Sequence, residues 1–162
     1  MKAKKYIISL IIVAVIVLAD QITKLLIVNN YNLKDEKQII GDFLVLTYIR
    51  NSGAAWGSFA GKTAILVIFS IIVFIFIFRS YIRILEDPKY KPIRICYLCV
   101  VGGAIGNMID RIRLHYVIDF IYFKFIDFPV FNIADIFVTL SVIVLVILFI
   151  FKYKDEDYEI IF

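Results

Sequence analysis

Four long runs of apolar residues, separated by shorter polar stretches, dominate the chain. They extend over about Lys5 to Val28, Thr63 to Phe78, Ile93 to Ile109 and Ile133 to Phe151. A helix needs about 20 predominantly apolar residues to cross the hydrocarbon core of a bilayer. Each run therefore predicts a membrane-spanning helix, and the second, which is the shortest, needs its flanks to span. We expect helices at about 5–28, 62–79, 93–111 and 132–152.

The polar stretches after the first and third runs have a pattern of their own. Ile39 to Tyr48 and Tyr116 to Phe125 are rich in β-branched and aromatic residues, which is typical of short strands. Ala54 to Ala60, with Trp56, has the composition of a short helix lying at a membrane interface. The segments at about 29–61 and 112–131 thus predict a small β-rich cap on a mainly α-helical membrane protein with a bundle of four transmembrane helices.

The distribution of Lys and Arg predicts how the bundle is oriented. Basic residues precede the first run, separate the second from the third, and follow the fourth: Lys2, Lys4, Lys5, Arg79, Arg83, Lys89, Lys91, Arg94, Lys152 and Lys154. Short loops that carry such charge remain on the cytoplasmic side. We therefore expect both termini in the cytoplasm, the β-rich cap outside, and an uncleaved first helix. Residues 1–162 are expected to form a single integral membrane domain.

Composition narrows the possible classes of protein. The chain is 62% hydrophobic, well above the level of a soluble domain. The net charge of +4 is modest and no basic stripe is interleaved with aromatic residues, so nucleic-acid binding is not expected. Cys96 and Cys99 form a lone Cys-x-x-Cys in the third run. Without a second pair they are interpreted as buried structural cysteines rather than a zinc or disulfide site.

Polar residues on different runs reach one depth of the bilayer. A helix rises 1.5 Å per residue, so Asp20 lies roughly 22 Å from Lys5 and Asn107 roughly 20 Å from Arg94, with Asp110 a little further. Asp135 lies a few residues inside the outer start of the fourth run, and Asp119 precedes that run. Ionisable groups in membrane segments are costly and usually functional. Their common level predicts an intramembrane site near the outer face.

Each of these residues also has a purely structural interpretation. Asp20 and Lys24 are spaced as an ordinary i,i+4 ion pair, and Asp110-Arg111 as a charge pair at a helix end. Asn132 and Asp135 have the spacing of a helix cap, and Gly102 and Gly106 that of close helix packing. It is the combination at one level that favours a functional site.

The residue types narrow the chemistry. His115 is the lone histidine, and neither a zinc-ligand cluster nor a phosphate-binding glycine loop is present in the sequence. Two neighbouring aspartates share a proton and serve as acid and base without a cofactor, which favours hydrolysis of an amide. A small proton or cation transporter using membrane-embedded carboxylates, and a non-catalytic lipid-binding scaffold, are the alternatives.

Five motifs occur in a specific order: Asp20 to Lys24, Asn51 to Trp56, Gly102 to Arg111, Val117 to Phe120, and Phe131 to Asp135. Together they resemble the lipoprotein signal peptidases, the signal peptidase II family of bacterial membrane aspartic proteases, over nearly the whole chain. Trp56 departs from the phenylalanine common in the family. The resemblance places the catalytic pair at Asp119 and Asp135. Its supporting residues are Asp20, Lys24, Asn51, Gly53, Asn107, Asp110, Arg111 and Asn132.

The resemblance also implies a substrate and a location. The substrate is a prolipoprotein whose cysteine carries diacylglycerol, cut on the N-terminal side of that cysteine. The enzyme is expected in the bacterial cytoplasmic membrane, among membrane lipids, with its active site at the outer face. We expect no cofactor or metal and a monomer. Which lipoproteins are cut does not follow from the residues.

Overall fold

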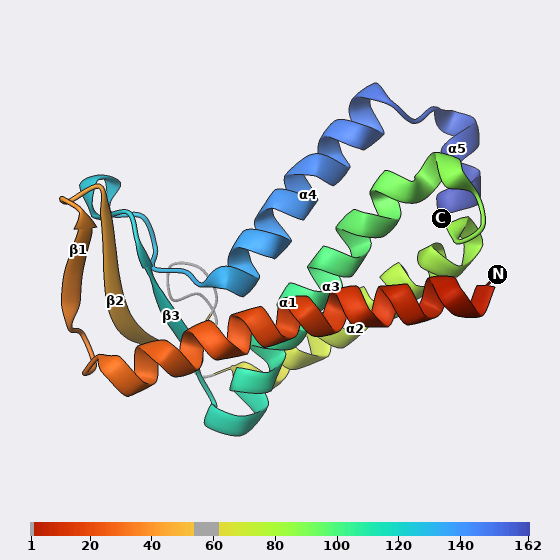
Figure 1. Ribbon diagram of the computed structural model, residues 1–162. Coiled ribbons are helices and arrows are strands. Elements are labelled where there is room, and N and C mark those ends of the chain that lie inside the picture. The colour runs from red at the N-terminus through yellow and green to blue at the C-terminus, as the bar shows by residue number, and fades with distance from the viewer. Residues whose placement is uncertain (1, 54–61) are drawn as a thin grey trace.

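The computed structural model describes residues 2–53 and 62–162 (Figure 1). Four helices in this part are long and apolar enough to cross a membrane. They are α1 (Lys2–Asn30), α2 (Thr63–Ile84), α3 (Lys91–Leu114) and α4 (Ile133–Phe151). The prediction of a mainly helical fold with four long apolar helices and a small sheet is confirmed.

Helix α3 packs between α1 and α4 through glycines. A Cβ atom at Gly102 would lie 2.9 Å from the Ile16 side chain of α1, and one at Gly103 would lie 2.5 Å from the Ala134 carbonyl oxygen of α4. Gly106 faces the carboxyl group of Asp20 in the same way. Side chains at these positions would force the helices apart, so the glycines permit the approach. The predicted close packing at Gly102 and Gly106 is confirmed.

A three-stranded antiparallel sheet stands at one end of the bundle (Figure 1). Its order is β1 (Glu36–Ile40), β2 (Leu44–Asn51) and β3 (Val117–Tyr122). The run predicted as one strand around Gly41 is a hairpin, because Gly41 has φ of +47° and turns the chain. The segment after β3 forms a 3-10 turn at Lys124–Ile126 instead of a longer strand.

The two faces of the sheet have different neighbours. Tyr48, Ile118 and Phe120 lie on one face and pack with Ile27 of α1. Asp119 pairs with Ile49 across the β2–β3 ladder, and alternation of side chains directs it to the other face. The strand thus keeps its core contacts on one side and presents a carboxyl group on the other.

The two chain ends lie together at the opposite end of the bundle (Figure 1). Residues Asp155–Ile161 form a short helix, α5, in which Asp155, Glu156 and Glu159 are exposed but Asp157 is buried. Asp157 is 3% exposed and accepts hydrogen bonds from the Lys89 ammonium and the Tyr90 hydroxyl. These donors, Lys89 first, lower the pKa of Asp157 to about 2.

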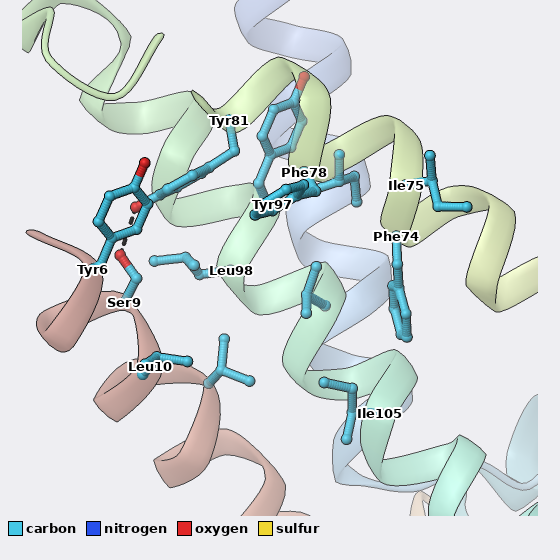
Figure 2. Close-up of a pocket in the computed structure, with 13 residues that line it drawn as sticks. Tyr6, Ser9, Leu10, Phe74, Ile75, Phe78, Tyr81, Tyr97, Leu98 and Ile105 are labelled. Atoms are coloured by element: carbon cyan, nitrogen blue, oxygen red, sulfur yellow. Dashed lines mark hydrogen bonds between the residues drawn. The ribbon is translucent and has the colours of Figure 1, made fainter. Parts of the chain in front are cut away.

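An apolar recess of about 520 Å³ lies between α1, α2 and α3 near that same end, as Figure 2 shows. Its walls include Leu10, Phe74 and Phe78. The Ser9 and Tyr81 hydroxyls at its edge bond each other at 2.5 Å. The described residues that line it are all uncharged. The interfacial helix expected at Ala54 to Ala60 falls outside the described residues.

Candidate active site

Asp119 and Asp135 approach one another from different elements. Asp119 lies in the middle of β3 and is 2% exposed. Asp135 is in the first turn of α4, where the positive end of the helix dipole favours a carboxylate. The strand and the helix start are joined laterally, because Phe131 forms an antiparallel bridge with Ile121 just before α4 begins.

Asn132 contacts both carboxyl groups. Its side-chain Nδ2 donates to Asp119 Oδ1 at 2.7 Å, and its backbone N–H donates to Asp135 Oδ2 at 3.1 Å. Its Oδ1 accepts from the Asp135 backbone N–H at 3.0 Å, which completes a capping box. The predicted helix cap is confirmed. Because one fully buried residue holds both groups, the cap also fixes their relative position.

Two further asparagines complete the coordination of the pair. Asn51, at the end of β2, donates to Asp119 Oδ2 at 2.8 Å. Asn107 of α3 donates to Asp135 Oδ1 at 2.8 Å, and its own Oδ1 accepts from Asn132 at 3.0 Å. Each carboxyl oxygen therefore receives a donor, so the rotamers of both aspartates are fixed by their neighbours.

A buried ion cluster lies directly behind the pair. The Lys24 ammonium is 2.8 Å from Asp20 Oδ2 and 2.9 Å from Asp110 Oδ2, and it donates to Asn107 at 2.9 Å. All three charged side chains are at most 3% exposed. The predicted Asp20–Lys24 ion pair is confirmed. Asp110, expected to pair with its neighbour Arg111, is held by Lys24 instead.

The cluster joins four elements through its carboxylates. Asp20 Oδ1 accepts from the Ala134 backbone N–H at the start of α4, 3.1 Å away. Asp110 Oδ2 accepts from the Ile118 backbone N–H of β3, 3.2 Å away. Since Asp20 belongs to α1 and Asp110 to α3, these contacts place the strand and the helix start that carry the aspartate pair.

Sequence reasoning missed Gln21. Its side-chain Nε2 donates to Asp20 Oδ2 at 3.1 Å, to Asp110 Oδ1 at 3.0 Å, and to the Gly106 carbonyl at 3.2 Å. The available signal was its place between Asp20 and Lys24 on a lipid-embedded helix, where an uncharged amide also needs a partner.

Arg111 connects the pair to the segment after β2. Its guanidinium donates to the Gly53 carbonyl at 3.1 Å, and the Gly53 N–H donates to Asn51 Oδ1 at 3.0 Å. Arg111 also interacts electrostatically with Asp135 and Asp119. It is therefore a positive group beside the aspartate pair rather than a member of the Lys24 cluster.

The environment of Asp119 changes its proton affinity. Burial, and then the charge of Asp135, raise the pKa of Asp119 to about 7, against the lowering effect of the donors on Asn51 and Asn132. The arrangement can thus keep one proton on the pair at neutral pH. Among the described residues no three His, Cys, Asp or Glu side chains gather as metal ligands.

The structure brings every predicted site residue into one hydrogen-bonded set, which we call the polar network. Asn51, Gly53, Arg111, Asn132 and the two aspartates form one part, and Asn107 links it to the Lys24 cluster. Fold and site together define a class: a multi-pass helical membrane protein with two carboxyl groups, one buried and one half-buried, bridged by an asparagine at one end of its bundle.

Comparison with known proteins agrees with this class. The profile of the signal peptidase (SPase) II family matches residues 12–151. A lipoprotein signal peptidase of Lactobacillus johnsonii is 40% identical over 153 residues, 93% of this chain and 97% of the relative. One of Caldanaerobacter subterraneus subsp. tengcongensis is 41% identical over 145 residues, covering 89% and 97%. The chain belongs to the signal peptidase II family and is a peptidase.

Solved structures show the same fold. A bacterial membrane enzyme structure determined by the in meso method has a TM-score of 0.81 at 35% identity, covering 91% of this chain and 92% of the other. A second such structure has a TM-score of 0.78 at 35% identity, covering 90% and 94%. This chain is therefore a bacterial membrane protein, and the transporter alternative is not supported.

Proposed function

We propose that the protein removes the signal peptides of prolipoproteins and that Asp119 and Asp135 carry out the cleavage. Membership of the signal peptidase II family supports the reaction and the prolipoprotein substrate. The observation that supports this choice of residues is the bridge made by Asn132, whose backbone and side chain bond one carboxyl group each. Asp20 and Asp110 are also bridged, but by the Lys24 ammonium, which pairs with both carboxylates.

The proposed mechanism needs one proton on the pair. With a pKa of about 7, Asp119 carries a proton in a large fraction of molecules at neutral pH, and we assign Asp135, at the start of α4, as the carboxylate. Asp135 takes a proton from a water molecule as the water oxygen bonds the scissile carbonyl carbon, and Asp119 gives its proton to the carbonyl oxygen. The C–N bond then breaks, Asp135 protonates the leaving amine, and a hydroxyl proton of the intermediate returns to Asp119.

The surrounding residues would act by position. Asn132 and Asn107 hold Asp135 through its two oxygens, and Asn51 and Asn132 hold Asp119. Prearranged donors of this kind need no reorganisation during reaction. Arg111 would offset negative charge as the intermediate forms. We assign these residues positioning roles and keep the catalytic role for the two aspartates.

The proposed position of the substrate follows from the orientation of the helical bundle in the membrane. The basic residues near both termini favour the cytoplasmic side for that end of the bundle. The sheet and the aspartate pair then lie at the outer face. A signal-peptide helix within the bilayer would bring its cleavage site to this level, with the diacylglyceryl chains of the cysteine among the lipids. Residues 1–162 would act as one domain and as a monomer.

Cleavage of a diacylglyceryl-modified precursor by the purified protein tests the proposal, with the unlipidated precursor as control. Asp119→Asn and Asp135→Asn should each lower the cleavage rate by about 10²–10⁴-fold, the typical contribution of a positioned acid or base. Asp42→Asn is the matched control, since Asp42 is an exposed aspartate in the hairpin turn. Wild-type rates in either of the first two variants would exclude the pair and favour a non-catalytic lipid-binding scaffold.

A further inference from the structure

A second recess lies on the face of the sheet that looks away from Asp119. It has a volume of about 430 Å³ between the end of α1, strand β2 and the end of α3. Arg50 and Arg113 line it together with Tyr48 and Tyr116. Tyr48 shares a core cluster with Ile118 and Phe120, the strand neighbours of Asp119. Side-chain alternation therefore separates this recess from the aspartate pair.

Arg50 is held in place by aromatic residues. Its Nε donates to the Tyr48 hydroxyl at 3.1 Å, and its guanidinium carbon lies 5.1 Å from the centre of the Tyr116 ring. An arginine stacked in this way loses less conformational freedom when it binds a phosphate with its remaining N–H groups. The guanidinium is thus oriented in advance for an anionic ligand.

The positive charge of Arg50 and Arg113 has no carboxylate counterpart among the residues that the structure describes. Within residues 2–53 and 62–162, neither Arg50 nor Arg113 lies within 4.0 Å of a carboxylate. Residues 54–61 contain no Asp or Glu in the sequence. Lys24 and Asp110, which also reach the recess, are already paired with one another. Two arginines therefore remain for an external anion.

The third wall of the recess is apolar and faces the lipid. Ile22, Leu25 and Val28 of α1 line it, and they are 54%, 59% and 39% exposed. These three residues belong to the last turns of a helix long and apolar enough to span a membrane. Tyr48 and Tyr116, which also line the recess, have the amphipathic character of residues at a membrane interface. The recess thus joins a cationic pocket at headgroup depth to a hydrocarbon surface below it.

We propose that this recess binds the phosphate of an anionic glycerophospholipid, whose acyl chains lie along α1. A soluble phosphate would use the two arginines and leave the apolar wall uncovered. A zwitterionic lipid would bring a second positive charge next to Arg50 and Arg113. An anionic lipid matches both the charge and the apolar surface, and it leaves the aspartate pair on the other face of the sheet free for substrate.

Native mass spectrometry of the full chain in detergent, titrated with phosphatidylglycerol or phosphatidylcholine, tests the proposal. The wild-type protein should bind phosphatidylglycerol at least about tenfold more tightly than phosphatidylcholine. This is the factor expected from one charge-assisted hydrogen bond. Arg50→Gln combined with Arg113→Gln should abolish the preference. Lys37→Gln combined with Lys62→Gln removes the same charge from exposed positions in β1 and just before α2, and should leave the preference intact.

Two further arms decide between explanations. Arg50→Lys combined with Arg113→Lys keeps the charge and should bind phosphatidylglycerol more weakly than wild type while unfolding at the wild-type temperature. Glycerol 1-phosphate should not compete with the lipid at equal concentration. Retained preference in the double Gln variant, an equal loss in the Lys37 and Lys62 control, or full competition by glycerol 1-phosphate would each overturn the proposal.

Discussion

Replacement of Lys24 by methionine tests how the buried ion cluster supports the site. Methionine has similar length and apolar bulk, so the change removes the charge and leaves little cavity. Two ion pairs of 2.8 and 2.9 Å are lost, each with a gross attraction of about 6 kcal/mol at an effective dielectric constant near 20. Most of that attraction only offsets the desolvation of the three charges, so the net loss is much smaller than the sum.

The net effect comes from the carboxylates that remain. Asp20 and Asp110 are 0% and 2% exposed, and without Lys24 they are two buried negative charges side by side. Breaking a buried pair by removing one partner costs about 3–5 kcal/mol. For a chain of this length that loss corresponds to an unfolding temperature lower by about 6–20 °C.

A thiol-reactive dye that reports the exposure of Cys96, which is buried in the folded protein, measures this unfolding when Cys99, which is only partly buried, is replaced by serine in every variant. Lys124→Met is the matched control, because Lys124 pairs with Glu36 at 2.6 Å on the surface, where both side chains are over 40% exposed. Exposed pairs contribute little, so this variant should unfold as the wild type does. Adding Asp20→Asn to Lys24→Met should cost less than the sum of the two single changes. Wild-type unfolding of Lys24→Met would refute the reasoning.

Three further results are expected. The cleavage rate should fall as pH rises through about 7, because Asp119 then loses the proton that its raised pKa retains. The protonated Asp119 also contributes to the free energy of unfolding: this contribution is fully present below pH 3.8 and is lost by about pH 7. Asp119→Asn should remove this pH dependence of stability. Gly106→Ala places a Cβ 3.0 Å from Asp20 Cγ, and such overpacking costs about 1–3 kcal/mol, measured with the same dye. Asp157→Asn should expose α5 to proteolysis and leave the rate of precursor cleavage unchanged. Since the pKa of Asp157 is lowered to about 2, the contribution of Asp157 to stability is present above pH 3.8 and is lost as pH falls towards 2.

The depth of polar residues could be predicted from the sequence, but their contacts could not. Helical rise alone places Asp20, Asn107 and Asp110 at one level, and the structure brings all three to Lys24. The rise gives no rotation about the helix axis, so the sequence offered Arg111 as the natural partner of Asp110. Gly102 and Gly106 lie on the side of α3 that faces α1, where the lack of a Cβ atom permits the close approach.

The sequence pattern predicted those contacts that join residues close together in the chain. The Asn132 cap depends on residues three apart and was predicted, but its second role as a donor to Asp119 depends on β3 lying beside it. Helix α5 could not be predicted for the same reason. Its charged residues resemble a solvated tail, but Asp157 is buried and accepts hydrogen bonds from Lys89 and Tyr90, which lie 68 and 67 residues away in the chain.

The charges of the polar network explain why the pair can keep a proton. Asp20 and Asp110 carry two negative charges against the single positive charge of Lys24, so the cluster behind the pair does not favour loss of the proton. The two largest causes of the raised pKa of Asp119 are its own burial and the charge of Asp135, whereas the charge of Lys24 lowers that pKa. A single ammonium group between α1 and α3 therefore stabilises the helices and also limits how far the proton affinity of Asp119 rises. The buried charges that join the helices of the bundle therefore also influence the protonation state of the aspartate pair.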